Sequence, residues 1–159
     1  MLGGFITKEE CAECRQCCKF ERCDLLLTPL ITPEVRELIL EKYLPGQQFI
    51  HREGCFLLRF DLEGGDSLDC PLLTERGCVM GDEKPFECRI WPLRVMDRDG
   101  ELVITLSPEC PAAAGKPIEL ARETARRLAP VIFGEAREHP ELVKPYDRGC
   151  EILFSEGDE

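Results

Sequence analysis

The stretch KEECAECRQCCKF at residues 8–20 contains four cysteines within eight positions, Cys11, Cys14, Cys17 and Cys18. A C-x2-C spacing lets two sulfurs converge on one metal ion at about 2.3 Å, and two such spacings in a row offer three convergent thiols. Cys18 is the odd member, because on a helical turn its side chain would point about 100° away from that of Cys17. Cys18 is therefore expected to serve a second metal, to help bridge a metal cluster, or to be a packed thiol.

A second group of thiols lies further along the chain, in CPLLTERGCVMGDEKPFECRIWPL at residues 70–93. This stretch holds Cys70, Cys78 and Cys88, and Cys110 follows in SPECP. A proline follows Cys70 and Cys110, as it follows the fourth cysteine of bacterial ferredoxin runs. Together the two groups offer enough thiols for two four-coordinate centres or one polynuclear centre. The predicted metal ligands are Cys11, Cys14, Cys17, Cys18, Cys70, Cys78, Cys88 and Cys110.

Three further cysteines lie outside these groups. Cys55 and Cys150 each precede an apolar stretch, so we expect both to be buried as small hydrophobic residues. Cys23 lies closest to the first group and is the best candidate for an additional ligand. The two histidines, His51 and His139, are expected to be surface or helix-capping residues rather than ligands.

The composition is that of an acidic, thiol-rich protein, with 159 residues, eleven cysteines and a formal net charge of −11. Such a charge argues against nucleic acid as a partner, because phosphate binding needs a clustered basic face. No stretch approaches the roughly 18 apolar residues of a membrane span, and the first residues lack the features of a signal peptide. We therefore expect a cytoplasmic protein with reduced thiols and no membrane partner. The odd number of cysteines also argues against a disulfide scaffold.

The remaining pattern predicts a small, irregular α+β domain stapled by metal, with two main helices and short antiparallel strands. A single domain is expected over residues 1–159, with its cysteine-rich core at 8–112. A threonine followed by proline and glutamate predicts a helix near 33–43. A longer helical segment is predicted at 117–138, with Leu120 among its buried residues. Its internal proline and glycine are expected to kink or split it.

Short strands and hairpins are predicted between the cysteine groups and after them. Residues 49–51 and 55–60 have strand composition. The Gly-Gly-Asp run at 64–66 predicts a hairpin formed by the strand before it and the residues after it. An Asp-Gly pair between 91–96 and 101–106 predicts a second hairpin.

Four pieces of the chain resemble the YkgJ-like family of cysteine-cluster proteins, also called CxxCxxCC, which are grouped as zinc- or iron-chelating domains. The pieces are CAECRQCC at 11–18, LTPLITPEV at 27–35, CPLLTERGCVMGDEKPFECRIWPL at 70–93 and SPECP at 107–111. The chain departs from the family in having Lys-Pro at 84–85, where Arg-Pro is common. The resemblance implies metal chelation by the eight cysteines and no established catalytic activity. Some relatives are associated with flagellin lysine methylation, which implies a protein partner.

Thiolate ligands favour zinc, iron–sulfur clusters or Cu(I) over hard cations. The predicted function is metal binding, with zinc or iron as the cofactor. A zinc site would stabilise the fold directly. The alternatives are an iron–sulfur protein in redox chemistry or modification of a protein partner, and a metal store with exchangeable thiolates. Arg15 and Arg89 flank thiols and are expected to offset thiolate charge, and Arg89 could equally hold an anionic ligand. No motif identifies a catalytic residue, and enzymatic activity stays open.

Overall fold

The computed structural model describes residues 1–158. Its internal contacts divide the chain into two compact units. We call Cys11–Arg89 the cysteine unit, and residues 1–10 with the chain from Ile90 onward the sheet unit. Both contain helices and short strands, so the predicted α+β class is confirmed. The single domain over 1–159 stays a prediction, because a division into compact units does not decide whether they fold together.

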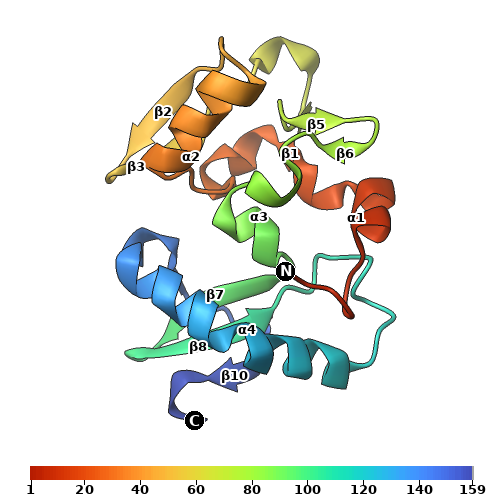
Figure 1. Ribbon diagram of the computed structural model, residues 1–159, viewed down its shortest axis with the longest axis vertical. Coiled ribbons are helices and arrows are strands. Elements are labelled where there is room, and N and C mark those ends of the chain that lie inside the picture. Colours follow the sequence, from red (N-terminus) through yellow and green to blue (C-terminus); the bar gives the residue numbers. More distant parts are fainter. Residues whose placement is uncertain (159) are drawn as a thin grey trace. The chain divides into compact units, whose positions relative to one another are not determined.

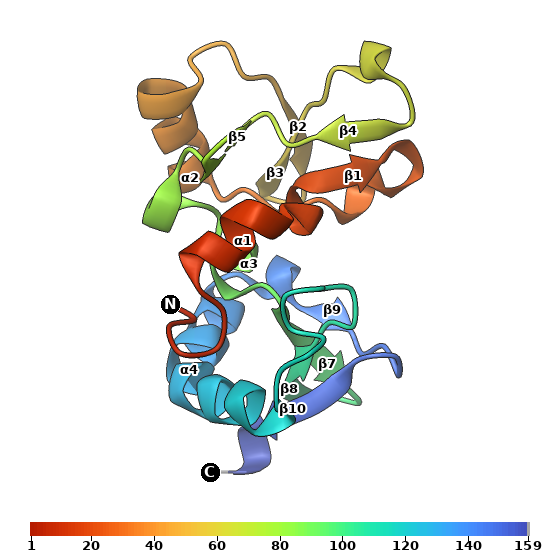
Figure 2. The ribbon, with the colours of Figure 1, turned by 90° about the vertical axis from the view of Figure 1, so that its right-hand side faces the viewer.

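The cysteine unit is built from short helices and three two-stranded antiparallel pairs, β2–β3 and β5–β6 (Figure 1) and β1–β4 (Figure 2). The boundaries between the two units, after Glu10 and after Arg89, fall within the first and the last helix of this stretch. The elements are α1 (Lys8–Cys14), β1 (Lys19–Glu21), α2 (Pro33–Leu38), β2 (Phe49–Arg52), β3 (Cys55–Leu58), β4 (Ser67–Asp69), β5 (Leu73–Thr74), β6 (Gly77–Cys78) and α3 (Phe86–Ile90).

Helix α2 begins as the sequence predicts. The Thr32 hydroxyl accepts a hydrogen bond from the Val35 N–H at 3.4 Å, and Pro33 occupies the first helical position. Both features stabilise a helix start, where backbone N–H groups lack partners. The helix continues as a π-helical turn over Ile39–Tyr43. The predicted helix near 33–43 is therefore confirmed, with a change of winding in its last turn.

The hairpin predicted around Gly64–Asp66 is wrong in its pairing. Strand β3 pairs with the preceding strand β2. Strand β4, which follows the glycines, pairs instead with β1, with Lys19 opposite Asp69. A three-residue strand gains little from its own backbone pairing, so burial of its apolar side chain decides which neighbour it joins. That side chain is Leu68, which lies in the core.

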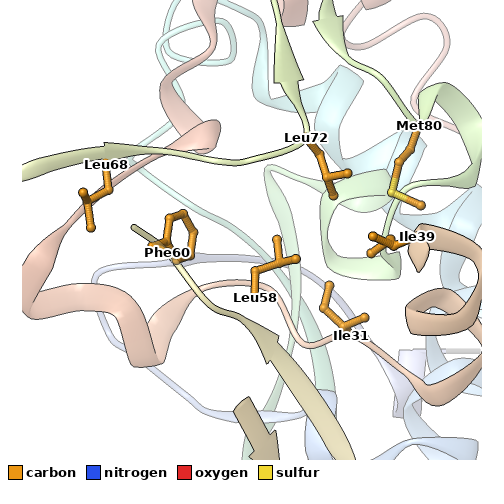
Figure 3. Close-up of a cluster of buried hydrophobic side chains, with 7 residues drawn as sticks. All are labelled: Ile31, Ile39, Leu58, Phe60, Leu68, Leu72 and Met80. Carbon is orange, nitrogen blue, oxygen red and sulfur yellow. The ribbon is translucent and has the colours of Figure 1, made fainter. Parts of the chain in front are cut away.

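The core of the cysteine unit is a cluster of seven buried side chains (Figure 3). Ile31 is 0% exposed, and its N–H and carbonyl groups both hydrogen-bond to Phe56 of β3 at 2.8 Å. Cys70 and Cys78 pack against the cluster. The core therefore supports two of the predicted ligands directly. Its members are Ile31, Ile39, Leu58, Phe60, Leu68, Leu72 and Met80.

The sheet unit is a four-stranded sheet packed against one long helix, α4 (Figure 2). The strand order is β10-β8-β7-β9, with β9 parallel to β7 and the other pairs antiparallel. Strands β7 and β8 meet at an Asp-Gly turn, so the hairpin predicted there is confirmed. The elements are β7 (Leu93–Arg98), β8 (Glu101–Leu106), α4 (Ile118–Glu138), β9 (Lys144–Pro145) and β10 (Glu151–Ser155).

Helix α4 is continuous over 21 residues with Pro130 inside it, so the expected split does not occur. Proline removes one backbone hydrogen bond, but residues on both sides of it are buried and hold the helix in place. The predicted burial of Leu120 is wrong, since its side chain is 37% exposed. The buried stripe starts at Ala121 and returns every three or four residues, which leaves Leu120 on the adjacent face. None of the described helices combines the length and apolar character of a membrane span.

Polar contacts anchor the first residues within the sheet unit. The Thr7 N–H donates to the Glu10 carboxylate at 2.8 Å, and the Glu10 N–H donates to the Thr7 hydroxyl at 3.1 Å. This reciprocal pair is a capping box at the start of α1. The Lys116 ammonium donates to the same carboxylate and to the Phe5 carbonyl, each at 2.7 Å.

These contacts make stability depend on pH. The hydrogen bond from Lys116 holds the pKa of Glu10 below its ordinary value, and the backbone hydrogen bond from Thr7 acts in the same direction. A carboxyl with a lowered folded pKa stabilises the protein above its unfolded pKa, and this stabilisation is lost as the pH falls through the folded pKa. We expect wild type to have a higher Tm than Glu10→Gln at pH 7, with the difference shrinking below about pH 4. Thermal unfolding from pH 7 to pH 3 checks this. Lys116→Met should remove only part of the pH dependence, because the Thr7 hydrogen bond to Glu10 remains, and it also loses the contact with the Phe5 carbonyl at every pH. A difference between wild type and Glu10→Gln that stays constant down to pH 3 would contradict the assignment.

Candidate metal centre

Strands β1 and β4 bring the two cysteine groups side by side. Cys18 directly precedes β1, and Cys70 directly follows β4. The antiparallel register places Lys19 opposite Asp69, and the Cys70 N–H donates to the Cys18 carbonyl at 2.7 Å. Two thiols that are far apart in the sequence therefore start from neighbouring backbone positions.

The β5–β6 hairpin returns a third cysteine to the same region. Leu73 lies opposite Cys78, and the Leu73 N–H donates to the Cys70 carbonyl at 2.9 Å. A further bond, from the Val79 N–H to the Leu72 carbonyl at 2.9 Å, extends this pairing beyond the hairpin. The seven residues between the two cysteines are thus folded back on themselves, and Cys78 lies beside the chain that leaves Cys70.

Helix α1 packs against this hairpin and carries Cys11 and Cys14. Gly77 has φ +99°, and a Cβ at this position would lie 3.2 Å from the Ala12 Cβ. The Arg15 side chain donates to the Ala12 carbonyl at 2.7 Å and to a carbonyl of the β5–β6 turn. Arg15 therefore joins two backbone segments, in addition to any effect of its charge on the thiols.

Gly77→Ala tests this contact. We expect it to lower the free energy of unfolding by about 1–3 kcal/mol, because alanine strains a backbone with positive φ and because its methyl group would press on Ala12. The control is Gly81→Ala, where φ is +55° but a Cβ would meet open space. Urea unfolding of both variants measures the difference. An equal loss in the two variants would show that the contact with Ala12 contributes nothing.

Helix α3 positions Cys88. Phe86 is buried at its start, and the Glu87 carboxylate accepts the Leu30 N–H at 2.7 Å. The Arg89 guanidinium lies 5.4 Å from the centre of the Phe86 ring, and its buried Nε has no hydrogen-bond partner among the described residues. The burial of Phe86 and the hydrogen bond from Leu30 tie α3 to the rest of the cysteine unit and so help to position Cys88.

Five thiols of the cysteine unit interact with one another, and we call them the thiol cluster: Cys17, Cys18, Cys70, Cys78 and Cys88. A hydrogen bond with Cys18, followed by burial, raises the pKa of Cys17. Burial raises the pKa of Cys70 to about 11, and the charges of Cys78 and Cys17 add to the rise. Burial also raises the pKa of Cys88 well above its ordinary value, with contributions from Cys70, Cys17 and Cys78.

The raised pKa values keep Cys17, Cys70 and Cys88 neutral near pH 7. A metal ion must therefore displace their protons, which makes binding depend on pH. Lys84 acts in the opposite direction, because its charge lowers the pKa of both Cys17 and Cys88. Sequence reasoning missed Lys84 in this role. The available signal was a basic residue at the position where the resembling family also has one.

The expected divergence of Cys17 and Cys18 is wrong, because their side chains are hydrogen-bonded. Helix α1 ends at Cys14, and Arg15 adopts a left-handed conformation with φ +54° before a 3-10 turn over Gln16–Cys18. The spacing of a regular α-helix therefore does not apply to this pair.

The sulfurs are gathered without forming a closed tetrahedral set. Over residues 1–158, no three cysteine sulfurs lie mutually within 4.8 Å. Sulfurs bound to one tetrahedral zinc ion are about 3.8 Å apart, given zinc–sulfur bonds of about 2.3 Å. Binding of a single ion would therefore have to draw the thiols closer by side-chain rotation.

The other cysteines occupy different environments. Cys55 and Cys150 are 0% and 4% exposed, so their predicted burial is confirmed. Cys23 is exposed, with its thiol 3.8 Å from the Glu21 carboxylate. Cys110 is buried in the sheet unit. Its predicted role as a ligand, like that of the other seven cysteines, stays a prediction.

The two histidines have different surroundings: His51 lies at the surface as predicted, whereas His139 is half-buried at the end of α4. His139 follows the last residue of α4, and its N–H donates to the Glu135 carbonyl at 2.8 Å. Its ring lies 3.3 Å from the Glu141 carboxylate. His51 is exposed and packs edge-on against the Phe56 ring, with centroids 5.3 Å apart.

In comparisons with known proteins, no family model matches the chain, and no curated protein or solved structure matches it either. The resemblance to the YkgJ-like family thus rests on the four sequence pieces alone and stays a prediction. The interpretation of the site depends on its own geometry and chemistry.

Proposed function

We propose that the protein binds metal through the thiol cluster, with zinc or iron as the ion. The hydrogen bond between Cys70 and Cys18 supports this most directly, because it joins the two cysteine groups at their ends. Sulfur ligands favour soft or borderline metals over magnesium and calcium. Cys11 and Cys14 on α1 are further proposed ligands in the same unit. The predicted ligand Cys110 belongs to the sheet unit.

Zinc is the first candidate, in a structural role. The thiol cluster draws on a 3-10 turn, the end of β4, the β5–β6 hairpin and α3. An ion bound to all four would hold short elements that have little backbone pairing of their own. Metal binding then contributes directly to folding stability, as it does in small zinc domains.

An iron–sulfur protein is the second candidate, supported by the number of thiols. One tetrahedral ion uses four sulfurs, whereas the thiol cluster offers five and α1 adds two more. The adjacent Cys17 and Cys18 suit a polynuclear centre, which uses more sulfurs than a single ion. Redox chemistry or modification of a protein partner would follow from such a centre. Membership of the YkgJ-like family and a cytoplasmic location belong to the same proposal.

Elemental analysis of protein purified without oxygen, with a visible spectrum of the same sample, tests the proposal. Near-integer zinc without visible absorption supports the structural role. Iron with sulfide and a charge-transfer band supports the second candidate. The Cys150→Ala variant is the control, because Cys150 is a buried thiol of the sheet unit outside the proposed ligand set, and it should hold the same amount of metal as wild type. Protein that holds no zinc or iron, and takes up neither on addition, would refute metal binding.

A further inference from the structure

The sheet unit contains an open cavity of about 990 Å³. Its walls are formed by the β7–β8 turn, the last part of α4 and the segment that follows this helix. Its volume lies at the upper end of the range of small-molecule sites, about 300–1,000 Å³. Leu102, Ala136, Val143 and Tyr146 supply apolar lining.

The charged lining of the cavity differs from the rest of the chain. Three basic side chains face two acidic ones there, whereas the whole chain has 31 acidic residues against 20 basic ones. The cavity is thus a local exception in an acidic protein and offers sites for both negative and positive groups. The charged lining residues are Asp97, Asp99, Arg98, Lys144 and Arg148.

Two of these residues already serve the fold. Arg98 forms an ion pair with the Glu101 carboxylate at 2.7 Å across the β7–β8 pairing. The Asp97 carboxylate accepts the Gly100 N–H at 2.9 Å and so holds the turn. Neither side chain is fully available to a ligand without loss of a structural contact.

Asp99 and Arg148 are different. Among the side chains that the structure describes, neither has a hydrogen bond or an ion pair, although both line the same cavity. Their opposite charges therefore lie more than 4.0 Å apart without neutralising one another. The backbone of each residue lies in a turn. Asp99 has φ +57° in the β7–β8 turn. Arg148 lies between Asp147 and Gly149, and the Asp147 carboxylate accepts the Gly149 N–H at 2.9 Å.

We propose that this cavity binds a short apolar peptide with both ends free. The Arg148 guanidinium would hold the peptide carboxylate through paired hydrogen bonds, which match its planar geometry. The Asp99 carboxylate would accept the terminal ammonium, and the apolar lining would contact the side chains. The volume of about 990 Å³ leaves room for more than a single amino acid, so a peptide is the proposed occupant. This inference goes beyond metal binding and does not depend on it.

Isothermal titration with the dipeptide Ala-Leu tests the inference on the full chain. N-acetyl-Ala-Leu lacks the ammonium and Ala-Leu amide lacks the carboxylate, so each should bind at least about tenfold more weakly, as expected for loss of a charged hydrogen bond. Arg148→Gln and Asp99→Asn should weaken binding of Ala-Leu by a similar factor. Asparagine tolerates the positive φ at residue 99, so the turn is kept. Arg126→Gln is the control, because Arg126 is an exposed arginine of α4 outside the cavity lining.

Weaker binding of both capped peptides and of both cavity variants, with an unchanged control, supports the peptide site. Equal binding of Ala-Leu and its N-acetyl form would show an anion site and overturn the proposal. Absence of any Ala-Leu binding would also overturn it. The metal content of the same preparations is measured in parallel, so failure of this inference does not count against metal binding.

Discussion

Replacement of Cys88 by serine is expected to lower the bound metal and the stability of the protein together. Serine keeps the size of the side chain but removes the soft sulfur ligand. A ligand present at 1,000 times its Kd stabilises the folded state by about 4 kcal/mol, so loss of a tightly bound ion should cost a similar amount. Elemental analysis and urea unfolding on the same preparation measure both effects.

Two controls separate the metal from the packing around it. Cys150→Ala removes a buried thiol of the sheet unit and should leave the metal content unchanged. Treatment of wild type with a strong chelator should reduce its stability to that of Cys88→Ser, because both lack the ion. If Cys88→Ser kept the full metal content of wild type, Cys88 would not be a ligand.

Leu72→Ala is expected to have the largest effect on stability alone. Leu72 is 2% exposed and belongs to the core of the cysteine unit shown in Figure 3. Truncation of a buried leucine to alanine costs about 2–5 kcal/mol. The same change should weaken metal binding, because Cys70 and Cys78 pack against this core. Urea unfolding and a competition titration with a metal indicator measure the two effects.

Leu128→Ala is the matched control for this prediction. Leu128 is 6% exposed and lies on the buried face of α4 in the sheet unit. It should lose a similar amount of stability without a change in metal affinity, provided that affinity is measured at a temperature where both variants are folded. Equal weakening of metal binding by the two variants would mean that the core around Leu72 has no specific role at the site.

The sequence predicts those elements whose signals are local. Thr32 and Pro33 mark the start of α2 because capping and a fixed proline φ act within one turn. The Asp99-Gly100 pair marks the β7–β8 hairpin because a tight turn needs positive φ at both positions. Burial of Cys55 and Cys150 follows from the apolar residues beside them.

Long-range pairing could not be predicted in the same way. The partner of β4 depends on the burial of Leu68 against residues from other parts of the chain. The exposure of Leu120 depends on which face of α4 meets the sheet, and a shift of one residue changes it. The contact between the Cys17 and Cys18 thiols depends on the left-handed Arg15, which is neither glycine nor asparagine and gives no signal in the sequence.

The candidate sites show the same division. Cysteine spacing predicts the type of ligand, but the β1–β4 register decides that Cys18 lies beside Cys70. Lys84 affects the thiols through space, and only the fold shows which thiols its charge reaches, Cys17 and Cys88. Asp99 and Arg148 lie far apart in the sequence, and the fold brings both to the lining of one cavity.

The pairing of β1 with β4 also has a consequence for how the chain can vary in length. Residues 19–69 leave and return at adjacent points, so the separation of Cys18 and Cys70 does not depend on the number of residues between them. Doubling a flexible loop costs only about 0.6 kcal/mol. The β2–β3 turn at Glu53–Gly54 belongs to this segment and is exposed. Homologues with insertions there, or an engineered peptide tag, can therefore keep the spacing of the thiols intact.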